Sequence, residues 1–242
     1  MVTRLRTRYQ RGTNRVTAAR AGDLALLGGL VALIAAGAAA GAVVQDVTAG
    51  RGATGLDRAV LEWFVRHREP WLTTVLKVVT ALGSSAVLIP VVVLVAGWWW
   101  RRRRTARPIA MLGASYLGAV LLSQSVKAIV GRARPPASLA VAHYSGRAFP
   151  SGHATLAVAG WGAIAALAAA RPSWRAKVAP WAGAVLAAAL IGVSRLYLGA
   201  HWLSDVLAGW VLGALWLVVV LLAVGTGDEP SVTDTSDRAP AM

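Results

Sequence analysis

The sequence predicts an all-α integral membrane protein: a bundle of six transmembrane helices, with one amphipathic surface helix between the first and second spans. Of its 242 residues, 57% are hydrophobic and only 14% are charged. A soluble domain would carry roughly 25% charged residues. The apolar residues fall into runs long enough to cross the ~30 Å hydrocarbon core of a bilayer. Cysteine is absent, which excludes disulfides and thiolate chemistry.

Six apolar runs are the predicted spans. They cover residues 24–44, 78–100, 109–126, 154–170, 178–193 and 206–224. We interpret the first as an uncleaved span, because it is longer than the roughly 7–15 residues of a signal-peptide core.

The predicted surface helix lies between the first two spans. Its apolar residues recur at helical spacing and comprise Leu56, Val60, Trp63 and Phe64. Asp57 and Glu62 are assigned to its polar, solvated face.

The distribution of basic residues predicts the topology. The chain divides into a basic arm (1–20), a membrane domain (21–224) and a polar tail (225–242) whose composition predicts disorder. Fourteen Lys and Arg lie in the arm, in 101–107 and in 171–177, against seven in the opposite loops outside the motifs described below. The positive-inside rule then places both termini in the cytoplasm of a multi-pass plasma-membrane protein. The net charge of +15 is thus explained by topology and contacts with anionic lipid, so no nucleic-acid partner is expected.

The stretch from Ser194 to Asp205 carries the strongest chemical signal. It places Arg195, His201 and Asp205 between two apolar runs. If the following helix begins near Ala200, His201 and Asp205 share one helical face. The Asp205 carboxylate could then accept a ring N–H of His201 and raise the basicity of the other nitrogen.

Two earlier motifs are predicted to meet this stretch on the outer face. One reads Lys127-Ala-Ile-Val-Gly-Arg-Ala-Arg134-Pro135 and the other Pro150-Ser151-Gly152-His153. Lys127, Arg134 and Arg195 supply cations for a phosphoryl group, which gathers negative charge in its transition state. Ser151 and Gly152 begin a helix, where free N–H groups favour an anion. His201 is the predicted nucleophile, oriented by Asp205, and His153 the general acid.

These motifs resemble those of the type 2 phosphatidic acid phosphatase family, which includes lipid diphosphate phosphatases and shares its site with vanadium-dependent haloperoxidases. The family patterns Lys-x6-Arg-Pro, Pro-Ser-Gly-His and Ser-Arg-x5-His-x3-Asp occur intact and in order at 127–135, 150–153 and 194–205. The resemblance implies a six-helix membrane phosphatase whose site lies at the outer leaflet. It also implies a phosphohistidine on His201, His153 as the acid, and no metal or other cofactor.

Several alternatives remain open on the sequence. A non-enzymatic lipid-binding or transport protein of the same fold would be expected to lack a catalytic His or Arg, and this chain lacks none. A channel fits less well, because the predicted spans contain no charged residue. Haloperoxidase chemistry suits the site but not the membrane framework. The substrate is left among polyprenyl diphosphate, which we favour, phosphatidylglycerol phosphate and phosphatidic acid. The oligomeric state is left open.

The remaining polar residues near the motifs receive weaker interpretations. His67 and His143 are expected to be solvated or interfacial, and Ser194 to cap or orient its loop. Arg132 and Arg147 are candidates to guide an anionic head group.

Overall fold

The computed structural model describes residues 53–169 and 173–224, and every regular element within these ranges is helical. The elements in chain order are α2 (Ala53–Arg66), α3 (Pro70–Ala81), α4 (Ser85–Arg103), α5 (Arg107–Val130), a 3₁₀ turn η1 (Ala137–Leu139), α6 (Gly152–Leu156), a π-helical turn η2 (Ala157–Trp161), α7 (Gly162–Ala168), α8 (Trp174–Tyr197) and α9 (Leu203–Val224). The basic arm, the first predicted span and the polar tail lie outside the described residues.

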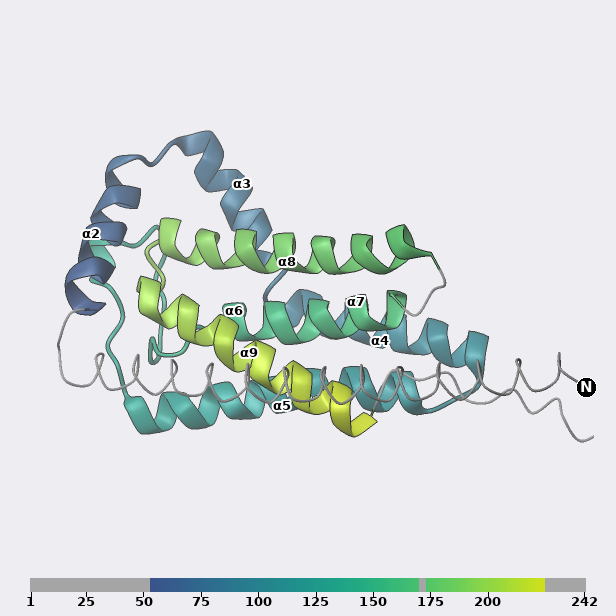
Figure 1. The fold of residues 1–242 in the computed structure, drawn as a ribbon. Coiled ribbons are helices and arrows are strands. Elements are labelled where there is room, and N and C mark those ends of the chain that lie inside the picture. The colour runs from purple at the N-terminus through teal and green to yellow at the C-terminus, as the bar shows by residue number, and fades with distance from the viewer. Residues whose placement is uncertain (1–52, 170–172, 225–242) are drawn as a thin grey trace, which may run out of the picture.

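Four helices of the described part are long and apolar enough to cross a membrane: α4, α5, α8 (from Ala176) and α9. The helical rod formed by α6, η2 and α7 runs beside them but is shorter, covering Gly152–Ala168. Figure 1 shows these five rods packed side by side into a bundle, with α2 and α3 at one end. The chain is therefore embedded in the membrane, and the count of six spans stays a prediction.

The second predicted span, residues 78–100, is wrong at its start. The predicted span is interrupted there: α3 ends at Ala81, and the next helix, α4, begins only at Ser85. Gly83 lies in the break, and a Cβ on it would fall 2.6 Å from the Ile191 side chain and 3.2 Å from the carbonyl oxygen of His153. The backbone thus passes close to α8 and α6 at this point, and the chain changes direction.

Helix α2 forms where the apolar periodicity predicts a helix, but its orientation differs from the prediction. Val60 and Phe64 pack against Leu196 and Val206, whereas Leu56 and Trp63 stay more than half exposed. Asp57, assigned to the solvated face, is 1% exposed. Asp57 is buried because the face of α2 that carries it packs against the junction of α8 and α9.

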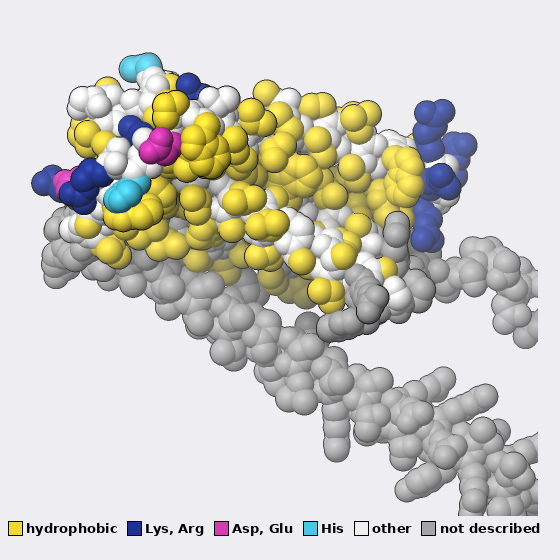
Figure 2. Space-filling view, turned by 90° about the horizontal axis from the view of Figure 1, so that it is seen from above, with side chains coloured by type: hydrophobic (Ala, Val, Ile, Leu, Met, Phe, Trp, Pro, Cys, Tyr) yellow, Lys and Arg dark blue, Asp and Glu magenta, His cyan; other side chains and the backbone are white. Residues whose placement is uncertain are grey.

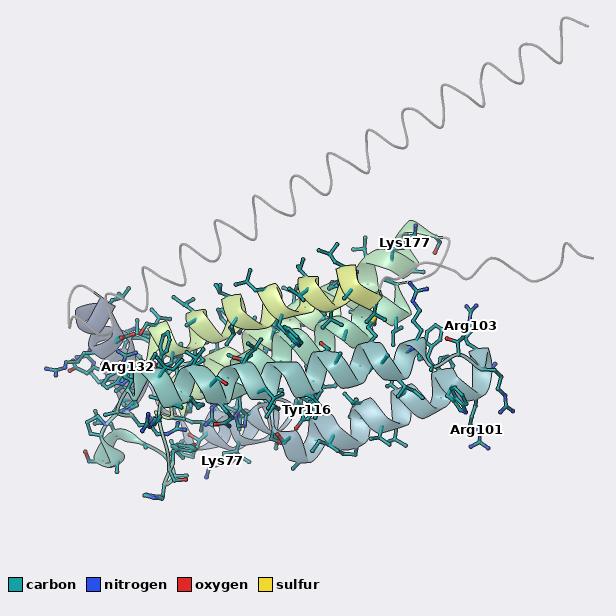
Figure 3. The ribbon with its side chains drawn as sticks, turned by 90° about the horizontal axis from the view of Figure 1, so that it is seen from below. Lys77, Arg101, Arg103, Tyr116, Arg132 and Lys177 are labelled. Carbon is teal, nitrogen blue, oxygen red and sulfur yellow. The ribbon has the colours of Figure 1, made fainter. Side chains whose placement is uncertain are left out.

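The two ends of the bundle differ in their charges. Figure 2 shows a broad hydrophobic surface between ends that carry the charged side chains. Arg101 and Arg103 in the last turn of α4 lie near Lys177 at one end, and Arg132 lies at the other (Figure 3). The motif loops therefore lie opposite the most basic loops, the arrangement on which the topology prediction rests.

Candidate active site

The three predicted motifs converge at one end of the bundle. Nη1 of Arg134 lies 3.2 Å from Nε2 of His201, which joins the first motif to the third. The backbone N–H of Ser151 donates to the carbonyl oxygen of Asp205 at 2.8 Å, which joins the second motif to the third. A Cβ on Gly152 would lie 4.0 Å from Cε of Lys127, so the first and second motifs also adjoin.

His201 lies in the turn between α8 and α9, not on α9 as predicted. The helix begins at Leu203 instead of near Ala200. Gly199 adopts a left-handed φ of 69°, and a Cβ there would meet the Leu139 carbonyl oxygen at 2.6 Å. The Asp205 carboxylate turns back instead, and its Oδ2 accepts the N–H of Trp202 at 2.9 Å.

The pairing of His201 with Asp205 survives this change. Nδ1 of the 2% exposed His201 lies 3.4 Å from Oδ2 of Asp205, which is an ion-pair distance. The geometry does not make a hydrogen bond, so Nδ1 remains a buried nitrogen without a hydrogen-bond partner. At this distance the carboxylate acts on the ring as a charge.

The contact with Arg134 determines which nitrogen of His201 can attack. A guanidinium has only N–H donors, so the Nε2 that faces it must present a lone pair. The proton of the neutral ring then sits on Nδ1, on the Asp205 side. Nε2 is therefore the ring nitrogen that is available to act as a nucleophile.

The surroundings of His201 favour its neutral form. Burial is the largest cause that holds its pKa well below the ordinary value, and the positive charges of Arg195, Arg134 and Lys127 lower it further. A histidine in this state keeps its lone pair at neutral pH, as a nucleophile requires.

Three cations face the same space, each held by neutral partners. Lys127 Nζ donates to the carbonyl oxygen of Arg147 at 2.8 Å. Arg134 donates to the carbonyl oxygens of Ser145, Gly146 and Ala200. Arg195 donates to Oγ1 of Thr80 at 2.9 Å and lies over the Tyr144 ring, 5.0 Å from its centroid. None of these contacts neutralises a cation, so the site retains a strong positive field.

Two motif side chains in the described part also present buried polar atoms without partners. These atoms are Oγ of Ser151 and Nε of Arg195, and Oγ of nearby Ser123 is a third. Ser151 precedes α6 without capping it, and the first N–H groups of a helix have no intrahelical acceptor. Phosphate oxygens would accept from these donors. His153 stands on this first turn, within the fields of Arg195, His201, Arg134 and Lys127.

The sequence does not predict the pairing of two residues next to the site, Arg132 and Asp57. Arg132, a candidate head-group guide, is instead bound to Asp57 and Asp205, at 2.6 Å from each carboxylate. The sequence assigns Asp57 to a solvated face, because nothing around a single Asp in an amphipathic stretch indicates a partner far along the chain. Arg147 is also not a free guide, since its Nη1 donates to the carbonyl oxygens of Lys127 and Ala128 at the end of α5.

The donor set suits an anion. Within residues 53–169 and 173–224, no three His, Asp or Glu side chains gather into a group that could hold a metal ion. Asp205 is the carboxylate nearest His201, and Arg132 already binds it. His67 and His143 are exposed, as expected, and the Ser194 hydroxyl donates to the Ile191 carbonyl oxygen within α8.

Comparison with known sequences gives a family and two relatives. The model of the PAP2 superfamily matches residues 108–228. The chain is 34% identical over 168 residues to phosphatidylglycerophosphatase B of Bacillus subtilis, a match that covers 68% of this chain and 81% of the relative. It is 32% identical over 108 residues to undecaprenyl-diphosphatase of Sulfolobus acidocaldarius, a match that covers 43% of this chain and 48% of that enzyme.

Two solved structures resemble the fold. The crystal structure of a transmembrane PAP2-type phosphatidylglycerolphosphate phosphatase from Bacillus subtilis matches with a TM-score of 0.69 and 29% identity, over 76% of this chain and 92% of that one. Aquifex aeolicus LpxE matches with a TM-score of 0.53 and 24% identity, over 68% and 93% of the two chains, and at this identity it supports the fold alone.

Proposed function

Because the chain belongs to the PAP2 superfamily, we propose that it is an integral membrane phosphatase, hydrolysing a lipid phosphate or lipid diphosphate through a phosphohistidine on His201. One observation carries the assignment of the site. Lys127, Arg134 and Arg195 act on a neutral histidine whose Nε2 faces Arg134, and two atoms of the motifs, Nε of the same Arg195 and Oγ of Ser151, are buried without partners. This is a receptor for a phosphoryl group with a nucleophile inside it.

The first chemical step transfers the phosphoryl group to the protein. Nε2 of His201 forms a bond to phosphorus while the bond from phosphorus to the lipid oxygen breaks. His153 gives its proton to the departing oxygen as general acid. The bound phosphate, itself negative, offsets the cations around His153 and so favours the protonated ring that this role needs.

The second step regenerates the histidine. Water attacks phosphorus, His153 takes its proton, and the P–N bond breaks to release inorganic phosphate. Lys127, Arg134 and Arg195 hold the phosphate oxygens throughout, and Asp205 stabilises the positive ring of His201. Each group then returns to its initial protonation state.

The relatives direct the choice of substrate. Phosphatidylglycerophosphatase and undecaprenyl-diphosphatase are the names of proteins about one-third identical to this chain. Their substrates share a phosphate at the head of a membrane lipid. We therefore propose phosphatidylglycerol phosphate and polyprenyl diphosphate as the first substrates to test, with phosphatidic acid as the third.

The proposed placement follows the charge distribution. The motif end of the bundle faces outward, and the loops with Arg101–Arg104 and Lys177 face the cytoplasm together with both termini. In this proposal the four long helices and the Gly152–Ala168 rod make five spans, and the apolar run 24–44 near the N-terminus adds the sixth. α2 lies at the outer membrane surface with Leu56 and Trp63 toward the lipid.

A substrate panel tests the function. Detergent-purified protein and its His201→Ala variant, each shown to be folded by thermal melting, would be incubated with the three lipids, and phosphate release measured. The wild type should release phosphate from at least one lipid, and a brief reaction with ³²P-lipid should leave acid-labile label on the protein. Absence of release from all three by folded protein would favour the non-enzymatic alternative.

A further inference from the structure

A buried charged chain lies behind the nucleophile. Asp57 of α2 is 1% exposed and binds Nη2 of Arg132 at 2.6 Å. Nη1 of the same guanidinium binds Oδ1 of Asp205 at 2.6 Å. Oδ2 of Asp205 then faces Nδ1 of His201 at 3.4 Å. The order from α2 to the attacking ring is therefore Asp57, Arg132, Asp205 and His201.

Asp57 is also fixed to the start of α9. Its Oδ1 accepts the backbone N–H of Ser204 at 2.8 Å, and its Oδ2 accepts the Ser204 hydroxyl at 2.7 Å. Ser204 Oγ accepts in turn from Nη1 of Arg132 at 2.7 Å. A carboxylate from a distant helix thus satisfies a donor that a helix N-terminus leaves free.

Arg132 has little freedom in this arrangement. Two carboxylates and a hydroxyl bind its guanidinium, which also lies over the Trp202 ring, 5.6 Å from the centroid. Its two Nη atoms bind different carboxylates, a geometry that a lysine ammonium cannot reproduce. The position of Arg132 therefore fixes that of the Asp205 carboxylate.

Asp205 needs this support for two reasons. Its side chain is 0% exposed, and an ionised carboxylate without a paired cation is strongly disfavoured in such a place. A protonated or rotated Asp205 would neither keep the His201 proton on Nδ1 nor stabilise the ring when it becomes positive. For metal-ligating histidines, loss of such an outer partner typically costs about 10- to 100-fold in activity, and we expect an effect of this size here.

We propose that Asp57 and Arg132 are positioning residues for the reaction, acting through Asp205 to hold His201 in its attacking tautomer. This inference rests on the proposed phosphatase function. Their side chains contact one another, Ser204, Asp205 and Trp202, on the Nδ1 side of His201, so we expect them to act on the rate of phosphoryl transfer and not on lipid binding. Helix α2 therefore contributes Asp57 to the support of the site, in addition to covering the end of the bundle.

The test is a double-mutant cycle with Asp205. Asp57→Asn and Arg132→Lys would each be made in the natural chain and in an Asp205→Asn background, and kcat and KM measured with ³²P-labelled lipid. In the natural chain we expect each to lower kcat about 10- to 100-fold, as loss of an outer partner typically does, with KM for the lipid nearly unchanged. In the Asp205→Asn background each should change kcat less than about threefold, because the route through Asp205 is already broken.

Controls separate positioning from folding. Glu62→Gln, an exposed acidic residue on the same helix, should leave kcat within about twofold. Inhibition by inorganic phosphate, which needs only the cations in front of His201, should be unchanged in Asp57→Asn and Arg132→Lys. Equal losses of kcat with and without Asp205, or loss of phosphate inhibition together with kcat, would overturn the proposal. An inactive natural chain would instead count against the phosphatase function itself. If Asp57→Asn does not fold, the Arg132→Lys arm of the cycle decides alone.

Discussion

Nη1 of Arg134 lies 3.2 Å from Nε2 of His201, so a cation from the loop after α5 contacts the atom that we propose attacks phosphorus. The same guanidinium donates to the Ala200 carbonyl oxygen at 2.7 Å, which holds it against the nucleophile's own turn. A phosphate oxygen that accepts from this Nη1 brings its phosphorus toward the Nε2 lone pair. We therefore expect this one contact both to set the tautomer of His201 and to guide the substrate.

The protonation of His201 can be measured directly. Burial is the main cause that lowers its pKa, and cations add to it, so its ¹⁵N signals should titrate below pH ~6.5, the ordinary value. Arg134→Gln should raise the midpoint, because it removes a positive charge, but the midpoint should stay below 6.5 because burial remains. With four histidines in the chain, loss of a signal in His201→Ala assigns it. A wild-type midpoint above 6.5 would contradict the neutral nucleophile.

Gly209 sets the distance between α9 and the turn at Ser151. A Cβ there would lie 2.7 Å from the carbonyl oxygen of Ser151 and 2.9 Å from Cβ of Ala154. Gly209→Ala should therefore push Ser151 away from Asp205, reduce activity and destabilise the fold by about 1–3 kcal/mol. Gly183→Ala on α8, where a Cβ meets nothing within 4 Å, is the matched control. Melting temperature and kcat/KM would be compared, and equal behaviour of the two variants would refute the packing argument.

The sequence predicts which motifs come together better than it predicts the helix ends. Motif spacing selects Lys127, Arg134, Ser151 and Arg195 as candidates, and the structure brings their three motifs to one end of the bundle. For the junction of α3 and α4 the sequence predicts only a soft break at Gly83 inside one span, because Gly83 lies in an apolar stretch, whereas the structure has two separate helices there. The cause of the break is the close approach to Ile191 and His153, and such an approach depends on distant parts of the chain.

The same limit explains the wrong interpretations of Asp57 and Arg132. Helical periodicity tells which residues share a face, but not whether that face meets solvent or another helix. Asp57 lies one turn from Val60 and Leu61 on a face that α8 and α9 cover. Asp57 pairs with Arg132, which lies 75 positions away in the sequence. The residues next to either of them do not predict this pairing.

Topology can be tested with single cysteines, because the natural chain has none. Ala142 in the motif loop and Ala106 before α5 are both exposed alanines at opposite ends of the bundle. Ala142→Cys should react with a membrane-impermeant thiol reagent in intact cells, whereas Ala106→Cys should react only after permeabilisation. The positive-inside rule gives this direction, and the reverse labelling would place the site in the cytoplasm.

Phosphatase activity should not need a metal ion. The groups around His201 are cations where a metal phosphatase would place carboxylates, and Asp205 is already bound to Arg132. Activity should therefore persist in excess EDTA, and vanadate, which mimics five-coordinate phosphorus, should inhibit it. The measurement is phosphate release from the best lipid substrate. Loss of activity in EDTA that magnesium restores would contradict the mechanism.

The roles of His153 and His201 can be separated by the leaving group. If His201 is the nucleophile, His201→Ala removes the covalent route and every substrate should suffer alike. If His153 is the general acid, its importance follows the pKa of the departing oxygen, and its assistance to a poor leaving group is worth roughly 10²–10⁴-fold. Phosphatidic acid expels an alkoxide, whereas an aryl phosphate expels a phenoxide that its ring stabilises.

His153→Ala should therefore damage hydrolysis of phosphatidic acid far more than hydrolysis of an activated aryl phosphate, with a lipid diphosphate between them. The measurement is kcat/KM of each variant on each substrate, with thermal melting to show that the protein is folded. Arg101→Lys, at an exposed position at the opposite end of the bundle, serves as the control and should leave all three values unchanged. Equal losses for His153→Ala across the leaving groups would mean that this ring positions the phosphate and does not deliver the proton.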